Sequence, residues 1–245
     1  MAKVAVIVVA AGKGERFGGS EKKTFAKIEG RPMFLRTLEH FINRDDVCQT
    51  ILVVAPEDES QVKEKYGANL GLMGIKLIIG GDQRPDSVAR GLESVGEEAD
   101  LVAIHDAARP CVSPAMIDRV FAEASKTGAA ILAARLCGTI KRVSEAGVID
   151  ATVAREQLWE AQTPQVFKPS LIADAYAARD QLEQEATDDA QLVEAAGHPV
   201  SIVPSDFSNL KITTKPDLTL AHAILKSRPA LKPKSTLGAF EEAQW

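Results

Sequence analysis

The chain has 245 residues, 45% of them hydrophobic, and a formal net charge of −5 at pH 7. It lies in the range of roughly 200–250 residues in which one large α/β domain is common. No apolar run reaches the about 18 residues that a membrane span requires, and the N-terminus lacks the small-residue cleavage pattern of a signal peptide. We therefore expect neither a membrane protein nor a secreted one. The sequence pI of about 5.5 argues against nucleic acid as a partner.

The chain contains three cysteines, Cys48, Cys111 and Cys137, which are scattered and have no CxxC spacing. An odd number of scattered cysteines is typical of reduced thiols rather than of a disulfide framework. We therefore expect a cytoplasmic protein.

Apolar strand-like runs alternate with helical patterns through the first 134 residues. The predicted strands lie at 3–9, 50–55, 75–79, 101–104 and 129–134, and the predicted helices at 32–43, 57–66, 86–95 and 114–126. Because the strands are apolar on both faces, the alternation predicts an α/β fold with a mostly parallel central sheet and helices on both faces. Ligands of such sheets bind at the carboxyl ends of the strands.

The alternation breaks after residue 134. Residues 138–153 predict a polar β-hairpin. We expect the hairpin and its flanking residues, about 136–157, to project as an arm that could contact another subunit. Beyond it we expect helices at 170–184, at 187–196 with Thr187 and Asp188 as caps, and at 216–226, and short strands near 199–203 and 210–213. Residues 1–226 are predicted to form a single domain and 227–245 a loose tail.

The first predicted strand runs into a glycine-rich, basic loop. Residues 1–36 carry eight Lys/Arg and three Asp/Glu although the whole chain is acidic. Gly12 and Gly14 let backbone N–H groups approach phosphate oxygens, and Arg16 and Lys23 add positive charge. The spacing fits neither a P-loop nor a dinucleotide fingerprint. We interpret the loop as a triphosphate site, with a mobile surface loop bearing incidental lysines as the alternative.

A second glycine turn follows the third predicted strand. Gly80 and Gly81 come directly after that strand, and Asp86 and Ser87 stand at the start of a helix. The exposed N–H and C=O groups of such a turn can hydrogen-bond a base edge. Ser87 taken alone is also typical of an ordinary helix N-cap.

Polar residues also follow the fourth predicted strand. A carboxylate at Asp106 can accept from a ribose hydroxyl or a Mg²⁺-bound water, and Arg109 can bind a phosphate; a structural Asp–Arg pair is the alternative. His105 is expected to be a packed or hydrogen-bonding histidine rather than a general base. Lys211 lies in a predicted strand, where a solvated lysine is the alternative to a functional one. No nucleophile-elbow, Cys/His or HExxH pattern occurs, which disfavours acyl transfer and zinc hydrolysis.

Seven segments taken in order resemble one family. The segments are AAGKGERFG…KKTF, GGDQRPDSV, HDAARP, GTIKR, LWEAQTPQVF, TDDA and NLKITTKPDL, and they span residues 4 to about 226. This combination resembles the 2-C-methyl-D-erythritol 4-phosphate cytidylyltransferases of non-mevalonate isoprenoid synthesis. The resemblance implies a Rossmann-like, GT-A-like nucleotidyltransferase domain, a homodimer, and an arm that completes the neighbour's active site.

The implied reaction is transfer of CMP from CTP to methylerythritol phosphate with release of pyrophosphate. The resemblance also implies Mg²⁺, bound mainly through the CTP phosphates. Two alternatives stay open: a cytidylyltransferase acting on ribitol 5-phosphate or another polyol phosphate, and a non-catalytic nucleotide-binding protein.

The resemblance assigns roles to individual residues in three groups. The catalytic group stabilises the transferring phosphoryl group or positions the acceptor, and it comprises Arg16, Lys23, Arg155 and Lys211. The group expected to contact CTP comprises Ala10, Ala11, Gly12, Gly14, Gly81, Asp82, Ser87, Asp106 and Ala107. The group expected to line the acceptor pocket comprises Arg109, Thr139, Thr163 and Thr187. No direct protein ligand to a metal is predicted.

One departure from the family pattern concerns the catalytic lysine. The family commonly has Pro-Lys-Gln before an aromatic residue, whereas this chain has Lys22, Lys23 and Thr24 before Phe25. Two adjacent lysines leave the assignment open, and the spacing of seven residues from Arg16 favours Lys23.

Overall fold

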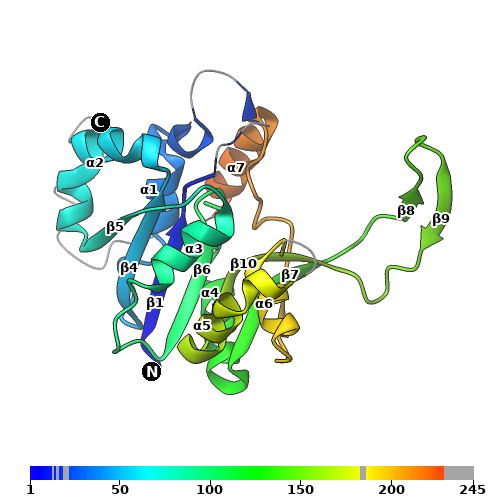
Figure 1. The fold of residues 1–245 in the computed structure, drawn as a ribbon. Helices are drawn as coiled ribbons and strands as arrows, with labels where there is room; N and C mark the ends of the chain where they lie inside the picture. Colours follow the sequence, from blue (N-terminus) through cyan, green and yellow to red (C-terminus); the bar gives the residue numbers. More distant parts are fainter. Residues whose placement is uncertain (13, 15–16, 19–21, 183–185, 229–245) are drawn as a thin grey trace.

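The computed structural model describes residues 1–12, 14, 17–18, 22–182 and 186–228 (Figure 1). Its centre is a seven-stranded sheet with the order β11-β7-β10-β6-β1-β4-β5. The strands are β1 (Val4–Val9), β4 (Val47–Val54), β5 (Ile75–Ile79), β6 (Leu101–Asp106), β7 (Ala129–Arg135), β10 (Trp159–Phe167) and β11 (Ser201–Ser205). Only β10 runs antiparallel to its neighbours among these pairings, so the predicted mostly parallel sheet is confirmed.

Helices cover both faces of this sheet. They are α1 (Met33–Leu38), α2 (Glu59–Leu72), α3 (Arg84–Leu92), α4 (Pro114–Thr127), α5 (Pro169–Ala177), α6 (Asp189–Ala195) and α7 (Lys215–Lys226). Successive residues of a strand point to opposite faces. Accordingly, Val6 of β1 packs in a cluster with Phe34 of α1 and Ile117 of α4, while Ile7 packs in another with Val88 of α3. The two clusters explain why β1 is apolar at every position.

A hairpin stands apart from the sheet and its helices, as Figure 1 shows for β8 (Ile140–Val143) and β9 (Ile149–Val153). The two strands pair antiparallel in a sheet of their own, and Gly147 has a positive φ of 78° in the turn between them. The predicted arm is therefore present. Val148 and Ile149 are apolar and more than half exposed on it, at 62% and 59%.

Several predicted boundaries differ from the structure. The helix predicted at 32–43 ends at Leu38, because the backbone then switches to tighter bonds from the N–H of His40 to Thr37 and of Phe41 to Leu38. The helix predicted at 57–66 begins after a 3₁₀ turn (Pro56–Asp58) and continues to Leu72.

The C-terminal half differs more. Residues 210–213 form no strand, and the one predicted there is wrong: Ile212 donates its N–H to Ala108 in a loop instead of to a strand partner. The strand predicted near 199–203 is β11, displaced to 201–205. Asp188 caps α6 as expected, since its side chain accepts from the N–H of Gln191.

Helix α5 ends at Ala177, short of the predicted residue 184, and a 3₁₀ turn (Arg179–Gln181) follows it. No helix within the described ranges is both long and apolar enough to cross a membrane. Helix α7 ends at Lys226, and most of the predicted tail lies outside the described residues.

Candidate active site

The carboxyl ends of four parallel strands, β5, β4, β1 and β6, lie along one edge of the sheet. Asp106, the last residue of β6, is in register with Val9, the last residue of β1. The chain continues the pairing just beyond, since Ala107 donates its N–H to Val9 at 3.0 Å and Ala10 donates to Val53 at 2.7 Å. The loops that follow β1 and β6 therefore leave the sheet side by side.

The turn after β5 closely approaches the loop after β1. A Cβ atom at Gly80 would lie 2.9 Å from the Cβ of Ala11 and 2.5 Å from the hydroxyl of Ser87, and one at Gly81 would lie 2.4 Å from the Cβ of Asp86. Such distances leave no room for a side chain, so glycine is required at both positions. The two glycine-containing segments singled out in the sequence thus meet at one edge of the sheet.

Ser87 has a different structural role from the N-cap proposed as its alternative. Helix α3 is capped by Gln83, which forms a reciprocal capping box with Asp86. The Ser87 side chain is fully buried in the helix, where its hydroxyl accepts from the N–H of Gly81 at 3.2 Å and donates to the carbonyl of Gln83 at 3.1 Å. Ser87 therefore fixes the conformation of the Gly81 turn. A direct contact with cytosine stays a prediction.

Gly14 of the glycine-rich loop lies next to Lys23. Gly14 has a positive φ of 67°, and a Cβ there would lie 3.1 Å from the Cβ of Lys23. Phe17 is buried and donates its N–H to Gly14, whereas Gly12 is exposed with open space around it. Arg16 lies outside the described residues.

Lys22 and Lys23 differ in their surroundings, which bears on the choice between them. The ammonium of Lys22 lies 2.9 Å from a carboxylate oxygen of Glu57 and 2.7 Å from one of Asp58. Burial opposes the charge of Lys22, but these carboxylates outweigh it and raise the pKa of Lys22. Two acidic groups therefore bind Lys22, and the assignment of the catalytic role to Lys23 stays a prediction.

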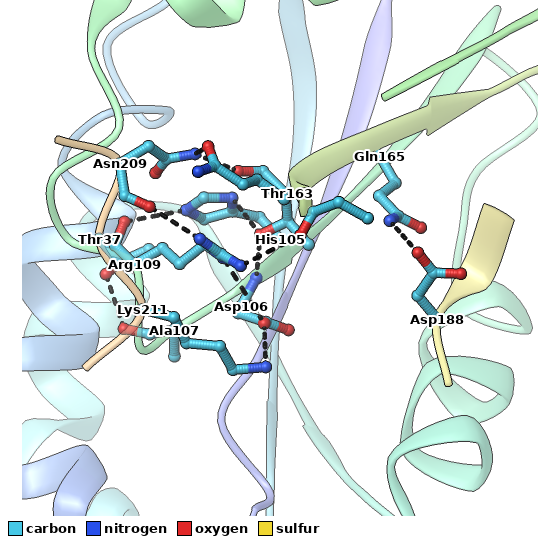
Figure 2. Close-up of polar contacts among 12 residues, drawn as sticks. Thr37, His105, Asp106, Ala107, Arg109, Thr163, Gln165, Asp188, Asn209 and Lys211 are labelled. Carbon is cyan, nitrogen blue, oxygen red and sulfur yellow. Dashed lines mark hydrogen bonds and ion pairs between the residues drawn. The ribbon is translucent and has the colours of Figure 1, made fainter. Parts of the chain in front are cut away.

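Asp106 is the centre of a group of cationic side chains (Figure 2). Its carboxylate lies 2.7 Å from the ammonium of Lys211, 3.3 Å from Nε of Arg84 and 4.0 Å from Nε of Arg109. Burial alone would raise the pKa of the Asp106 carboxyl, but the charges of Arg84, Lys211 and Arg109 outweigh it and hold that pKa well below its usual range. Asp106 is therefore ionised at any physiological pH.

A buried hydrogen-bonded chain lies beside Asp106. The hydroxyl of Thr163 accepts from the N–H of Asp106 at 3.0 Å and lies 3.0 Å from Nδ1 of His105, while Nε2 of His105 lies 3.2 Å from the carbonyl of Arg109. A carbonyl only accepts, so Nε2 carries the proton and Nδ1 accepts from Thr163. This assigns a neutral His105, with no solvent exposure.

Comparison with known proteins decides the family. The family model described as 2-C-methyl-D-erythritol 4-phosphate cytidylyltransferase matches residues 4–227. The enzyme of that name from Rhodopirellula baltica is 46% identical over 91% of this chain and 95% of its own, and that from Alkaliphilus metalliredigens is 40% identical over 92% and 94%. The chain belongs to this cytidylyltransferase family.

Solved structures of the family share the fold. The crystal structure of the cytidylyltransferase from Thermus thermophilus superposes with a TM-score of 0.74 and 32% identity, covering 91% of this chain and 99% of that one. The 4-diphosphocytidyl-2C-methyl-D-erythritol synthase from Anaerococcus prevotii gives a TM-score of 0.76 at 29% identity, covering 92% and 99%. The sheet described above is thus the family's nucleotidyltransferase fold.

Several of the family-based assignments lie at the strand edge, and two lie on the arm. Those at the strand edge include Ala10, Ala11, Gly81, Asp106 and Lys211. Thr139 and Arg155 instead belong to the segments that lead into and out of the arm; both are exposed, and Arg155 donates to the carbonyl of Cys137 across the arm's stem.

Three further assignments fall on residues whose contacts are structural. Arg109 is 5% exposed and donates to the carbonyls of Asn209 at 2.7 Å and Ala161 at 3.5 Å. Thr163 is 4% exposed and holds Asp106 and His105. Thr187 is exposed and donates to the side-chain oxygen of Gln191 at 3.1 Å. Acceptor binding by these three residues stays a prediction.

The family motifs contain residues whose importance the sequence interpretation missed. Arg84 joins Asp106 to Asp189 of α6, with Arg84–Asp189 distances of 3.1 and 2.7 Å, and Asp189 also accepts from the hydroxyl of Tyr176 at 2.6 Å. Gln165 of β10 donates to the cap residue Asp188 at 2.9 Å. For Gln165 the available signal was a polar residue within a strand, because such residues are buried only when paired.

The buried His105 predicts a pH dependence of stability. Burial lowers the pKa of His105 to about 3, so the folded chain keeps it neutral where the unfolded chain, with a pKa of about 6.5, takes up a proton. The free energy of unfolding is expected to fall as the pH drops from 6.5 toward 3, with a loss from His105 of about 2 kcal/mol at pH 5. More than about one pH unit above 6.5, His105 contributes almost no slope.

Urea unfolding at pH 7 and pH 5 checks this expectation. In His105→Gln, which cannot titrate, the difference in unfolding free energy between the two pH values should shrink by about 2 kcal/mol. An unchanged difference would show that His105 is protonated in the folded chain.

Proposed function

We propose that this chain transfers CMP from CTP to 2-C-methyl-D-erythritol 4-phosphate, giving 4-diphosphocytidyl-2-C-methyl-D-erythritol and pyrophosphate. The observation that carries the proposal is the ion pair of Lys211 with Asp106, at the strand edge where the turn after β5 meets the loop after β1. A carboxylate for the nucleotide and a cation for the acceptor phosphate are thereby neighbours. The family membership supplies the identity of the two substrates.

The chemistry requires charge stabilisation more than proton transfer. A phosphate oxygen of the acceptor attacks the α-phosphorus of CTP and forms a new P–O bond. The bond to the bridging oxygen breaks, and its electron pair leaves with pyrophosphate. The attacking phosphate is anionic near pH 7, so no general base is needed, in keeping with the neutral, buried state of His105. Arg16 and Lys23 would offset the charge that develops on the α-phosphoryl group.

In the proposed reaction Mg²⁺ is bound by the CTP phosphates. In the part of the chain that the structure describes, no group of three or more His, Cys, Asp or Glu side chains could hold a metal ion. Asp106 is an ionised oxygen donor at the strand edge, which suits a Mg²⁺-bound water or a ribose hydroxyl. When bound, Mg²⁺ would neutralise charge on the triphosphate and on the departing pyrophosphate.

A pyrophosphate-release assay tests the function. Purified protein is mixed with CTP, Mg²⁺ and either methylerythritol phosphate or ribitol 5-phosphate. We expect release with the first acceptor, little with the second, and none after chelation with EDTA. Preference for ribitol 5-phosphate would show that the enzyme is a polyol-phosphate cytidylyltransferase instead. CTP binding without release from either acceptor would support a non-catalytic nucleotide-binding protein.

We further propose a homodimer in which the arm of one chain completes the site of the other. The exposed apolar residues of the arm and its separation from the sheet support this arrangement (Figure 1). A cytoplasmic location remains the expectation from the scattered cysteines, which are all free.

Mixed dimers test the exchange of arms. Arg16→Ala and Arg155→Ala chains should each be nearly inactive, because each lacks one half of the site. Mixed dimers purified from co-refolded chains should recover activity, up to roughly half of wild type, because each has one intact site of two. Pyrophosphate release is measured on dimers that carry two different affinity tags. An absence of recovery in such purified mixed dimers would place both halves of the site in one chain.

A further inference from the structure

Lys211 is carried by a segment without regular secondary structure, residues 206–214. Its ammonium nevertheless lies 2.7 Å from the buried carboxylate of Asp106. Loops of this kind are ordinarily among the more mobile parts of a protein. The position of Lys211 therefore depends on contacts that hold the segment against the sheet.

Asn209 is the main contact of this segment. It has no solvent exposure, and its amide nitrogen donates to the side-chain oxygen of Gln162 at 3.0 Å and to the carbonyl of Thr163 at 2.9 Å. Both partners are oxygens, so only the nitrogen of the Asn209 amide fits there. Its backbone carbonyl accepts from Arg109 at 2.7 Å.

Gln162 of β10 holds the start of the same segment. The Gln162 side chain is 1% exposed; its oxygen accepts from the hydroxyl of Ser205 at 2.6 Å, and its nitrogen donates to the carbonyl of Asp206 at 3.2 Å. One amide thus contacts the chain at Ser205, Asp206 and Asn209. We refer to the paired amides of Gln162 and Asn209 as the amide clasp.

The amide clasp holds the chain before Lys211, and one backbone hydrogen bond holds it after Lys211. Asn209 lies two residues before Lys211, and Ile212, which follows it, donates its N–H to Ala108 at 2.8 Å. Two residues span at most about 7 Å, so an anchored Asn209 leaves the backbone of Lys211 little freedom. The flexible lysine side chain then begins from a fixed point beside Asp106.

We propose that the amide clasp is a positioning device that sets Lys211 for the phosphate of the acceptor. Asn209 and Gln162 act through Lys211 and do not touch substrate themselves. The inference rests on the proposed function, in which Lys211 binds the acceptor's phosphate. Loss of the clasp would leave the lysine present but badly placed, and would weaken acceptor binding without weakening CTP binding.

Steady-state kinetics of Asn209→Ala with CTP and methylerythritol phosphate test the proposal. We expect KM for the acceptor to rise about tenfold or more, as for loss of a charge-assisted hydrogen bond, with KM for CTP within about twofold of wild type. The double variant Asn209→Ala/Lys211→Ala should be no worse than Lys211→Ala alone, because both changes act on the same contact. Equal increases in both KM values, or fully additive effects in the double variant, would overturn the proposal.

Gln49→Ala is the matched control. The Gln49 amide also clasps a loop, since it donates to the carbonyl of Ser94 and accepts from the N–H of Gly96, both at 2.9 Å. It lies near the start of β4, at the opposite end of that strand from the site. The control should leave both KM values unchanged. If Asn209→Ala does not fold, Ser205→Ala removes one hydroxyl from the clasp; a smaller rise confined to acceptor KM supports the proposal, and unchanged acceptor KM overturns it.

Hydrogen exchange separates failure of the clasp from failure of the proposed function. A wild-type protein that releases no pyrophosphate contradicts the function but leaves the clasp testable. The Ile212 N–H should then exchange faster in Asn209→Ala than in wild type or Gln49→Ala. Equal exchange in all three proteins would show that the clasp does not hold the segment.

Discussion

Lys23→Ala is expected to lower kcat for pyrophosphate release by on the order of 10²–10⁴, as for loss of a cationic stabiliser in phosphoryl transfer. The lysine lies against Gly14 of the glycine-rich loop, where a Cβ would lie 3.1 Å from the Cβ of Lys23. Removing the charge should raise the barrier more than it weakens substrate binding, because the charge on the α-phosphoryl group is largest in the transition state. Arg16→Ala should act in the same direction. Stopped-flow or coupled-enzyme measurement of pyrophosphate gives kcat directly.

The neighbouring lysine provides the matched control. Lys22 directly precedes Lys23 in the sequence, and its ammonium forms ion pairs with Glu57 and Asp58. Lys22→Ala should therefore leave kcat within a few-fold of wild type and change mainly the stability of this corner of the fold, by about 1 kcal/mol or less for a partly exposed ion pair. The reverse result, with Lys22→Ala inactive and Lys23→Ala active, would exchange the two assignments.

Asp106→Ala is expected to abolish nearly all activity and to destabilise the fold. The substitution removes the carboxylate that lies between Lys211 and Arg84 at a largely buried site, so that Lys211 loses this partner and Arg84 keeps Asp189. Breaking one partner of a buried charge pair costs about 3–5 kcal/mol, and the exposure of Lys211 places the expected loss near the lower end. The activity should fall at least about 10²-fold, since the ionised carboxylate and the position of Lys211 are lost together. Urea unfolding and pyrophosphate release measure the two effects.

Asp46→Asn separates the effect on the site from the general loss of an ion pair. Asp46 pairs with Arg44 at 2.7 and 2.9 Å outside the site. Its loss should reduce stability by less than that of Asp106 and leave kcat unchanged. Near-normal turnover in a folded Asp106→Ala protein would remove Asp106 from the site.

The alternation of apolar runs was sufficient to predict the sheet, its mostly parallel direction and the helices on both faces. These features depend on short-range periodicity, which is readable wherever each residue's environment follows from its neighbours in sequence. The same reasoning failed at residues 210–213, where LKIT resembles a strand. Its backbone instead donates from Ile212 to a loop carbonyl at Ala108, a partner about a hundred residues away.

In the candidate site, too, the sequence predicted some features and could not predict others. Asp106 and Lys211 were identified from their motifs, yet their ion pair could not be, because nothing local to either residue refers to the other. Ser87 was considered as an N-cap from its place at a helix start, but Gln83 holds that position and Ser87 fixes Gly81 from inside the helix. A shift of a few residues in a helix boundary changes such a role entirely.

The sequence by itself determined the fold class, the order of the family motifs and the placement of glycines and charged residues at strand ends. Only the tertiary structure showed that Lys22 is paired with Glu57 and Asp58 and that the amides of Gln162 and Asn209 are paired beside Lys211. The physical reason is that these pairings join residues separated by 35 to 47 positions. Such contacts are set by strand order and register, which bring distant side chains within hydrogen-bonding distance and leave no trace in the local pattern.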